Sequence, residues 1–104
     1  MFKLIVLLIK NDNLTDEEFT RYWLYTHTSL VKKIPGVRKY VVNVVKKSLN
    51  SEPDYHGVAE LWFDNFESMK MAWASPEGRT IQEDTYRFAS SITSLYIDEH
   101  DIPL

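Results

Sequence analysis

The chain contains no cysteine and only three glycines in 104 residues. Without cysteine there is no disulfide, no thiolate nucleophile and no thiolate metal ligand. So few glycines exclude a glycine-rich phosphate loop, and no Gly-x-Ser-x-Gly elbow of a serine hydrolase occurs. The three histidines, His27, His56 and His100, lack the spacing of a paired metal site, so we expect no bound metal.

An excess of basic charge is also missing, since 12 Lys and Arg residues stand against 15 Asp and Glu residues, for a net charge of −3. Phosphate binding needs a concentrated basic face, so we expect no nucleic-acid partner. The apolar segment MFKLIVLLIK is shorter than the roughly 20 residues of a membrane-spanning helix, and it lacks the features of a signal peptide. We therefore expect a cytoplasmic protein with no membrane partner.

What the chain does have is a hydrophobic fraction of 44%, which is ample for a core, and we predict a single domain over residues 1–104. Segments rich in β-branched and large apolar residues predict four strands, at 2–10, 37–47, 56–64 and 91–99. A polar loop is predicted at 48–55, between the second and third strands.

Helix signals fall between these strands. Thr15 and Glu18 fit a capping box, which predicts that a helix begins after the first strand. After the third strand, Asp64 and Glu67 offer another capping pair, and a Ser-Pro step at 75–76 restarts the helix. The resulting strand–helix–strand–strand–helix–strand order predicts an α+β, ferredoxin-like βαββαβ fold with a four-stranded antiparallel sheet.

Both faces of the predicted strands are apolar. In the first strand, for example, Leu4 and Val6 point one way while Ile5 and Leu7 point the other. Helices on one side of the sheet cover only one face, and an antiparallel sheet with a solvated face normally alternates apolar with polar residues. We therefore predict a homodimer that packs sheet to sheet as a dimeric α/β barrel.

Three segments resemble motifs of EthD-domain proteins. They are FTRYWLYTHTSL at 19–30, HGVAELWFDNFESM at 56–69 and ASPEGRTIQEDTYRFAS at 74–90. The resemblance implies the dimeric α/β-barrel superfamily, a pocket between sheet and helices, and chemistry without a cofactor. Named relatives include a methylmuconolactone methylisomerase, tetracenomycin-type polyketide cyclases and fungal polyketide dehydratases. One departure is His56, where family members commonly carry an acidic residue.

Three residues are candidates for catalysis. His27 lies one turn from Trp23 on the apolar side of the first helix, and the family motif has a histidine at this position; the alternative is a hydrogen-bonded core histidine. Glu60 would orient His27 if it faces the helices, and would otherwise form a structural ion pair. Asp84 lies on the inner side of the last helix, either as a partner for His27 or as part of a cap or ion pair.

A second group of residues is expected to contact the ligand. Tyrosine hydroxyls can stabilise an enolate oxygen, indoles can stack on a flat ring, and a histidine near a loop can lie at a pocket mouth. These predicted substrate-binding residues are Tyr22, Trp23, Tyr40, His56, Trp62 and Tyr96.

The preferred interpretation is an EthD-like, cofactor-independent enzyme that binds a small cyclic or aromatic oxygenated molecule. It would act by proton transfer, giving isomerisation, cyclisation or dehydration. Two alternatives stay open from the sequence. One is a non-catalytic small-molecule binding or accessory protein, and the other is a cofactor-free monooxygenase of the same superfamily.

Overall fold

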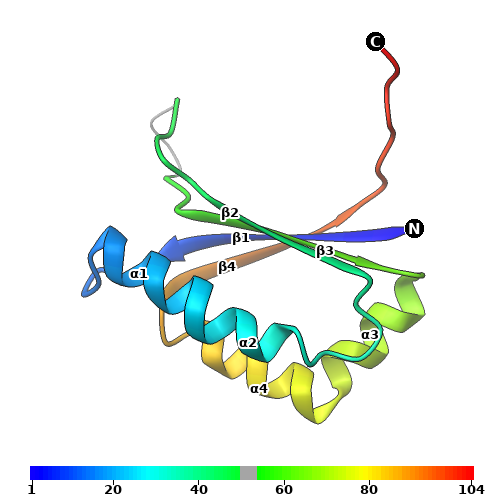
Figure 1. Ribbon diagram of the computed structural model, residues 1–104, viewed down its shortest axis with the longest axis horizontal. Coiled ribbons are helices and arrows are strands. Elements are labelled where there is room, and N and C mark those ends of the chain that lie inside the picture. Colours follow the sequence, from blue (N-terminus) through cyan, green and yellow to red (C-terminus); the bar gives the residue numbers. More distant parts are fainter. Residues whose placement is uncertain (50–53) are drawn as a thin grey trace.

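The computed structural model of the protein describes residues 1–49 and 54–104. Its helices and strands follow one another along the chain in the predicted order of strand, helical region, two strands, helical region and strand (Figure 1). In chain order they are β1 (Phe2–Lys10), α1 (Asp16–Tyr22), the π-helical segment η1 (Trp23–His27), α2 (Thr28–Val31), β2 (Lys39–Val44), β3 (Gly57–Phe63), α3 (Phe66–Ala74), α4 (Pro76–Thr85) and β4 (Ala89–Ile97).

The four strands form one sheet in the order β2-β3-β1-β4, and each neighbouring pair is antiparallel. All the helices lie against one face of this sheet, and in the described part of the chain no helix or strand covers the opposite face (Figure 1). This arrangement confirms the predicted ferredoxin-like α+β fold. No helix in the described part of the chain has the length and apolar character that a bilayer crossing requires.

The first helical region is continuous from α1 through η1 to α2, with one widened turn. The Thr28 N–H donates to the carbonyl of Trp23, five residues earlier, instead of four. In an α-helix, residues four apart drift by about 40° around the axis at each step. The widened turn counters this drift, and it keeps Phe19, Trp23, His27 and Val31 buried on the side facing the sheet.

The predicted capping box at the start of α1 is confirmed. The Thr15 hydroxyl accepts from the Glu18 N–H at 3.1 Å, while the Glu18 carboxylate accepts from the Thr15 N–H at 2.9 Å. The predicted restart is confirmed as well, since Ser75 caps α4 and Pro76 occupies its first turn. Both caps satisfy backbone donors that would otherwise lack partners at a helix start.

The cap of α3 is one residue later than predicted. The Asn65 side chain accepts from the Ser68 N–H at 2.8 Å, so Asn65 is the capping residue. Asp64 instead accepts two hydrogen bonds from the Arg38 guanidinium, at 3.1 and 2.9 Å. Aspartate and asparagine are equally good capping residues. Because the Arg38 cation engages the Asp64 carboxylate, Asn65 is the residue that caps α3.

The predicted strands agree with the structure except at their ends. β1 has the predicted bounds, whereas β2 is shorter than the predicted 37–47 because its ladder with β3 runs only from Lys39 to Val44. Residues 50–53 of the predicted loop 48–55 lie outside the described residues.

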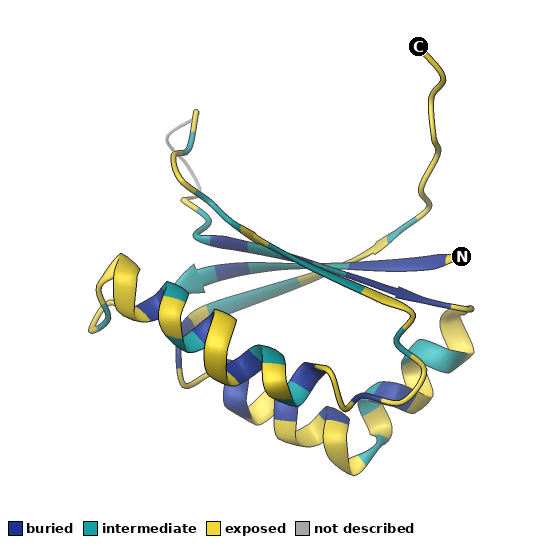
Figure 2. Ribbon diagram, viewed as in Figure 1, coloured by how far each residue is buried: buried dark blue, intermediate teal, exposed yellow. Residues whose placement is uncertain are grey.

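The core lies between the helices and the covered sheet face. Figure 2 shows the buried residues on the sides of the helices that face the sheet, with exposed residues on their outer sides. The largest fully buried side chains are Trp23, Phe19, Phe63, Phe88 and Leu8. Phe88 packs within 5.5 Å of Phe19 and 4.8 Å of His27, between ring centroids, so the first helical region and the chain leaving α4 share one aromatic cluster.

Candidate functional site

A cavity of about 440 Å³ lies inside the layer between sheet and helices. This volume is within the range of small-molecule sites. Residues from all four strands and from η1, α2, α3 and α4 line it, and the lining is mostly apolar. Its exposed lining residues are Gln82, Tyr86 and Ser94, so the cavity opens between the end of α4 and β4.

His27 is the titratable group that connects this cavity with a buried carboxylate. Its Nδ1 lies 2.8 Å from Oδ2 of Asp84, and the two residues are only 5% and 8% exposed. With Nδ1–H donating to the carboxylate, the neutral ring presents an unprotonated Nε2. In the described part of the chain, Nε2 of His27 forms no hydrogen bond with the protein. Every fully buried side-chain nitrogen or oxygen there does have a partner, so Nε2 is not fully buried. Because His27 lines the cavity, Nε2 opens to it.

The protonation state of His27 follows from its burial. Desolvation lowers the pKa of His27 below its usual value, and the hydrogen bond and negative charge of Asp84 oppose only part of this effect. The imidazole is therefore neutral near neutral pH and can accept a proton. Of the two carboxylates predicted as possible partners of His27, Asp84 is the one that lies beside it.

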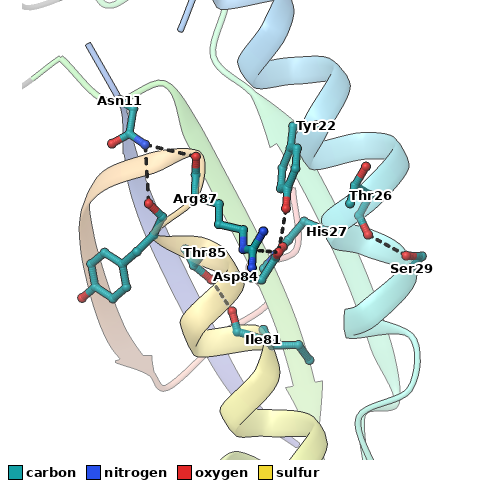
Figure 3. A network of polar contacts seen from close by, with 10 residues as sticks. Asn11, Tyr22, Thr26, His27, Ser29, Ile81, Asp84, Thr85 and Arg87 are labelled. Atoms are coloured by element: carbon teal, nitrogen blue, oxygen red, sulfur yellow. Dashed lines mark hydrogen bonds and ion pairs between the residues drawn. The ribbon is translucent and has the colours of Figure 1, made fainter. Parts of the chain in front are cut away.

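Asp84 is held from two further sides (Figure 3). The Tyr22 hydroxyl donates to its Oδ1 at 2.6 Å, and the Arg87 guanidinium lies 3.7 Å from the same oxygen. Desolvation, followed by the hydrogen bond to Asp84, raises the pKa of Tyr22, so the phenol remains a donor. Tyr22 from α1 and His27 from η1 thus fix the two oxygens of a carboxylate that α4 supplies.

Tyr40 brings a second polar group to the cavity from β2. Burial raises the pKa of Tyr40 to about 12, and the nearby Trp23 side chain opposes this increase. The phenol is therefore protonated near neutral pH and can donate a hydrogen bond. Trp23 and Tyr40 both line the cavity, as predicted for ligand-contacting residues.

Two other polar side chains of the lining are already engaged with the backbone. The Gln82 amide donates to the carbonyls of Trp73 and Gly78 at 3.1 Å each. The Thr85 hydroxyl donates to the Ile81 carbonyl at 2.8 Å. The side chains of the lining that keep hydrogen-bonding capacity for a ligand include His27, Tyr40, Tyr86 and Ser94. His27 is the neutral base among them, and Tyr40 is the phenol away from the opening, where Tyr86 and Ser94 are exposed.

Glu60 and Trp62 do not belong to this site. Both lie on the bare sheet face, in register with Ile5 and Lys3 of β1, whereas Leu61 between them points into the cavity. Glu60 pairs with the Lys3 ammonium at 2.8 Å, which lowers the pKa of Glu60. The prediction that Glu60 meets His27 needed it to face the helices, so the alternative of a structural ion pair applies.

His56 and Tyr96 also lie outside the cavity. His56 Nδ1 accepts from the Lys10 N–H at 3.0 Å, and the ring lies beside a separate surface groove between α1 and the end of β2. Tyr96 stacks on Phe66, with ring centroids 5.6 Å apart, at the far end of β4. Tyr22 does not line the cavity either, and its hydroxyl donates to Asp84 rather than facing a ligand.

Residues of α3 and α4 that the sequence prediction did not assign to the site complete the cavity wall. Met69 and Trp73 come from α3, and Ile81 and Thr85 come from α4. Ile81, Thr85 and Phe88 are spaced as i, i+4 and i+7, which is the spacing of one helix face. This spacing is visible in the sequence and could have placed Thr85 on the cavity side of α4.

The fold is therefore of the ferredoxin-like class. Its site is an apolar cavity beside a histidine that is hydrogen-bonded to a buried carboxylate. The chain belongs to the EthD domain family, whose profile matches residues 11–92. An uncharacterized 11.0 kDa protein in the thcB-thcC intergenic region of Rhodococcus erythropolis is 28% identical over 98 residues, which are 93% of this chain and 95% of that protein.

Solved structures agree with this membership. An ethyl tert-butyl ether D (EthD) family protein from Bacillus halodurans superposes with a TM-score of 0.81 at 26% identity, over 96% of this chain and 100% of that chain. A hydroxynitrile lyase from Passiflora edulis has a TM-score of 0.75 at 11% identity, over 97% and 96%. A dimeric ferredoxin-like protein from Thermobifida fusca has a TM-score of 0.73 at 14% identity, over 92% and 88%. The last two show the fold alone.

Proposed function

We propose that this protein is a cofactor-independent enzyme that moves a proton within a small cyclic or aromatic oxygenated molecule. The reaction class is isomerisation, cyclisation or dehydration. The observation that carries this proposal is the 2.8 Å contact between Asp84 Oδ2 and His27 Nδ1, which leaves the basic Nε2 directed to the cavity. That some proteins of this fold are enzymes, such as the hydroxynitrile lyase, agrees with the proposal.

In the proposed step, His27 Nε2 takes a proton from a carbon next to a ligand carbonyl. The electron pair of that C–H bond moves toward the carbonyl oxygen and forms an enolate. The Tyr40 hydroxyl donates a hydrogen bond to the oxygen as its charge develops. The imidazolium, stabilised by Asp84, then returns the proton to another carbon or to a departing hydroxyl, so that protons and electrons balance.

A binding protein without chemistry is the main alternative. It would be favoured if the protein itself satisfied every polar group of the cavity. The engaged side chains of Gln82 and Thr85 fit that description, but the free Nε2 of His27 does not. The basic Nε2 has no structural partner that would explain its place at the cavity wall, which favours proton transfer.

The test uses exchange of the acidic hydrogens of 2-tetralone with solvent deuterium, followed by proton NMR. We expect the wild-type protein to accelerate exchange and His27→Gln to lose about a hundredfold or more of that rate. His100→Gln is the matched control, because His100 lies in the exposed tail and contacts only Asp98. Equal rates for His27→Gln and the wild type, with both folded, would exclude His27 as the base.

The same preparation separates the alternatives. Binding of 2-tetralone without acceleration of exchange by the wild-type protein would support a binding or accessory role. Oxygen uptake with an anthrone, dependent on the protein and without added cofactor, would support the monooxygenase alternative.

We also infer that a second copy of the chain covers the bare sheet face. Apolar side chains from all four strands share this face with the Lys3–Glu60 pair. They are Ile5, Leu7, Ile9, Val41, Val58, Trp62, Leu95 and Ile97. Soluble monomers seldom leave so extended an apolar patch in water, and a related fold from Thermobifida fusca is described as dimeric.

Sedimentation tests this dimer. Leu7 lies near the middle of the bare face, paired with Val58 on one side and Thr93 on the other. We expect Leu7→Lys to convert a dimer to a monomer, because the partner would bury an unpaired ammonium. Leu24→Lys, on the exposed side of the first helical region, is the matched control and should stay dimeric. A wild-type chain that sediments as a monomer would overturn the inference.

A further inference from the structure

The wall of the cavity carries no formal charge. In the part of the chain that the structure describes, no Lys, Arg, Asp or Glu side chain lines it. Apart from the indole N–H groups of Trp23 and Trp73, the polar lining consists of one imidazole, two phenols, two hydroxyls and an amide, contributed by His27, Tyr40, Tyr86, Thr85, Ser94 and Gln82. A ligand that enters with a net charge would therefore find no counter-ion on the surface that it touches.

The charged group behind the cavity wall is an anion, which also disfavours an anionic ligand. The Asp84 carboxylate lies directly behind the His27 ring, only 8% exposed, and it is the partner of that ring rather than part of the wall. Its cationic neighbour Arg87 is 3.7 Å away on the solvent side and does not line the cavity. An anion in the cavity would thus meet hydrogen-bond donors such as the Tyr40 hydroxyl but no cation to offset the rest of its lost hydration.

We propose that the site selects uncharged ligands, such as phenols, ketones or alcohols, and rejects carboxylates and other anions with the same carbon skeleton. The inference rests on the proposed function, since it takes the cavity beside His27 as the place where the substrate binds. The neutral state of His27 supports it, because burial lowers the pKa of this residue and removes the one cation that the wall could offer.

A ligand series that differs only in charge tests the selection. The probes are 1-naphthalenemethanol, 1-naphthoate and 1-naphthylmethylammonium, titrated into the full chain near neutral pH in a calorimeter. We expect the neutral alcohol to bind about tenfold or more tightly than the naphthoate, because the carboxylate loses its hydration without meeting a cation. The ammonium should also bind more tightly than the naphthoate, because the free Nε2 of His27 and the Asp84 carboxylate behind it disfavour only the anion. Equal or tighter binding of the naphthoate, or no binding of the alcohol, would overturn the inference.

A charge placed at the cavity opening provides the converse test. Gln82→Lys adds an ammonium to an exposed lining residue of α4. We expect its affinity for 1-naphthoate to rise about fivefold, with little change for the alcohol. Glu83→Gln adds the same net charge at the next residue, which does not line the cavity, and should change neither. Equal gains in both variants would mean that only the overall field matters and would overturn the site-specific inference.

The failure of this inference and that of the proposed function are distinguishable. Charge selection is measured by binding alone, whereas proton transfer is measured by the exchange of 2-tetralone hydrogens. A protein that prefers the neutral probe but does not exchange 2-tetralone keeps the inference and loses the proposed function. If exchange depends on His27 but 1-naphthoate binds as tightly as the alcohol, the proposed function is kept and the inference of charge selection is lost.

Discussion

The indole of Trp23 occupies the space beside Gly57 where any other residue would place its β-carbon. This close approach sets η1 against β3 and holds the Trp23 side chain at the wall of the cavity. Glycine is needed at position 57 for this contact rather than for an unusual backbone angle, since the one glycine with a positive φ among the described residues is Gly36.

We therefore expect Gly57→Ala to destabilise the protein by about 1–3 kcal/mol, the usual cost of overpacking a core. Urea unfolding measures the change, and near-ultraviolet circular dichroism reports the displaced indole. Trp23→Phe frees space at the contact, so the alanine should cost less in the Trp23→Phe background than in the wild type. An equal cost in both backgrounds would contradict the proposed contact.

The folding free energy should depend on pH through His27. Its folded-state pKa is lowered, so below the usual value near 6.5 the unfolded chain binds a proton that the folded chain does not. Stability is thus fully present above that pH and falls as the pH is lowered, with a slope of up to about 1.4 kcal/mol per pH unit for one proton. Urea titrations from neutral to mildly acidic pH measure this slope.

His27→Gln supplies the control for that slope, because glutamine does not titrate. In this variant the fall in stability should begin only at the lower pH where carboxylates titrate, such as Glu60, whose pKa is lowered by Lys3. If the variant shows the same slope as the wild type just below pH 6.5, the effect has another origin.

The Tyr22 hydroxyl is expected to tune His27 through the carboxylate that they share. Tyr22→Phe removes the 2.6 Å hydrogen bond to Asp84 Oδ1 and leaves that oxygen with the more distant Arg87. More of the negative charge is then available to the imidazolium, so the pKa of His27 should rise, with a loss of about 1–2 kcal/mol of stability. Titration of the His27 Cε1 proton by NMR measures the change.

Tyr25→Phe is the matched control for this substitution. Tyr25 is 78% exposed on the outer side of the same helical region and takes no part in the Asp84 network. An unchanged His27 titration in Tyr22→Phe, or an equal change in Tyr25→Phe, would show that the hydroxyl does not act through Asp84.

The fold was predictable from the sequence because each element carries its own local signal. β1 is a run of large apolar residues with a turn signal after it, and α1 begins at a capping box whose two hydrogen bonds are present. The π-helical segment also had a signal in the four-residue spacing of Phe19, Trp23, His27 and Val31. An ideal α-helix would not keep four residues at that spacing on one face.

The site was only partly predictable, because it depends on which sheet face the helices cover. Glu60 and Leu61 alternate along β3, but both faces are apolar, so strand periodicity alone could not tell which residue faces the helices. The pairing of His27 with Asp84 joins residues 57 positions apart. It depends on how the first helical region and α4 sit side by side, which no local pattern encodes.

Lys3 lies on the bare sheet face between two carboxylates. The residue is 9% exposed, and its ammonium pairs with Glu60 at 2.8 Å and with Glu99 at 2.9 Å. The same ammonium lies 4.8 Å from the centre of the Trp62 ring. Pairing with Glu60 and then Glu99 raises the pKa of Lys3, so the cation persists. If a second copy covers this face, Glu60 and Glu99 enter the interface together with the Lys3 cation. Pairing with that cation lowers the desolvation cost of burying their two carboxylates.

Lys3→Met should therefore weaken the dimer more than it weakens the fold of each subunit. We expect its dissociation constant, measured by sedimentation, to rise about tenfold or more, because two carboxylates would enter the interface without their cation. Lys32→Met removes an exposed cation next to the end of α2, away from this face, and should leave dissociation unchanged. A Lys3→Met protein that dissociates like the Lys32→Met control would place the Lys3 cluster outside any interface between copies.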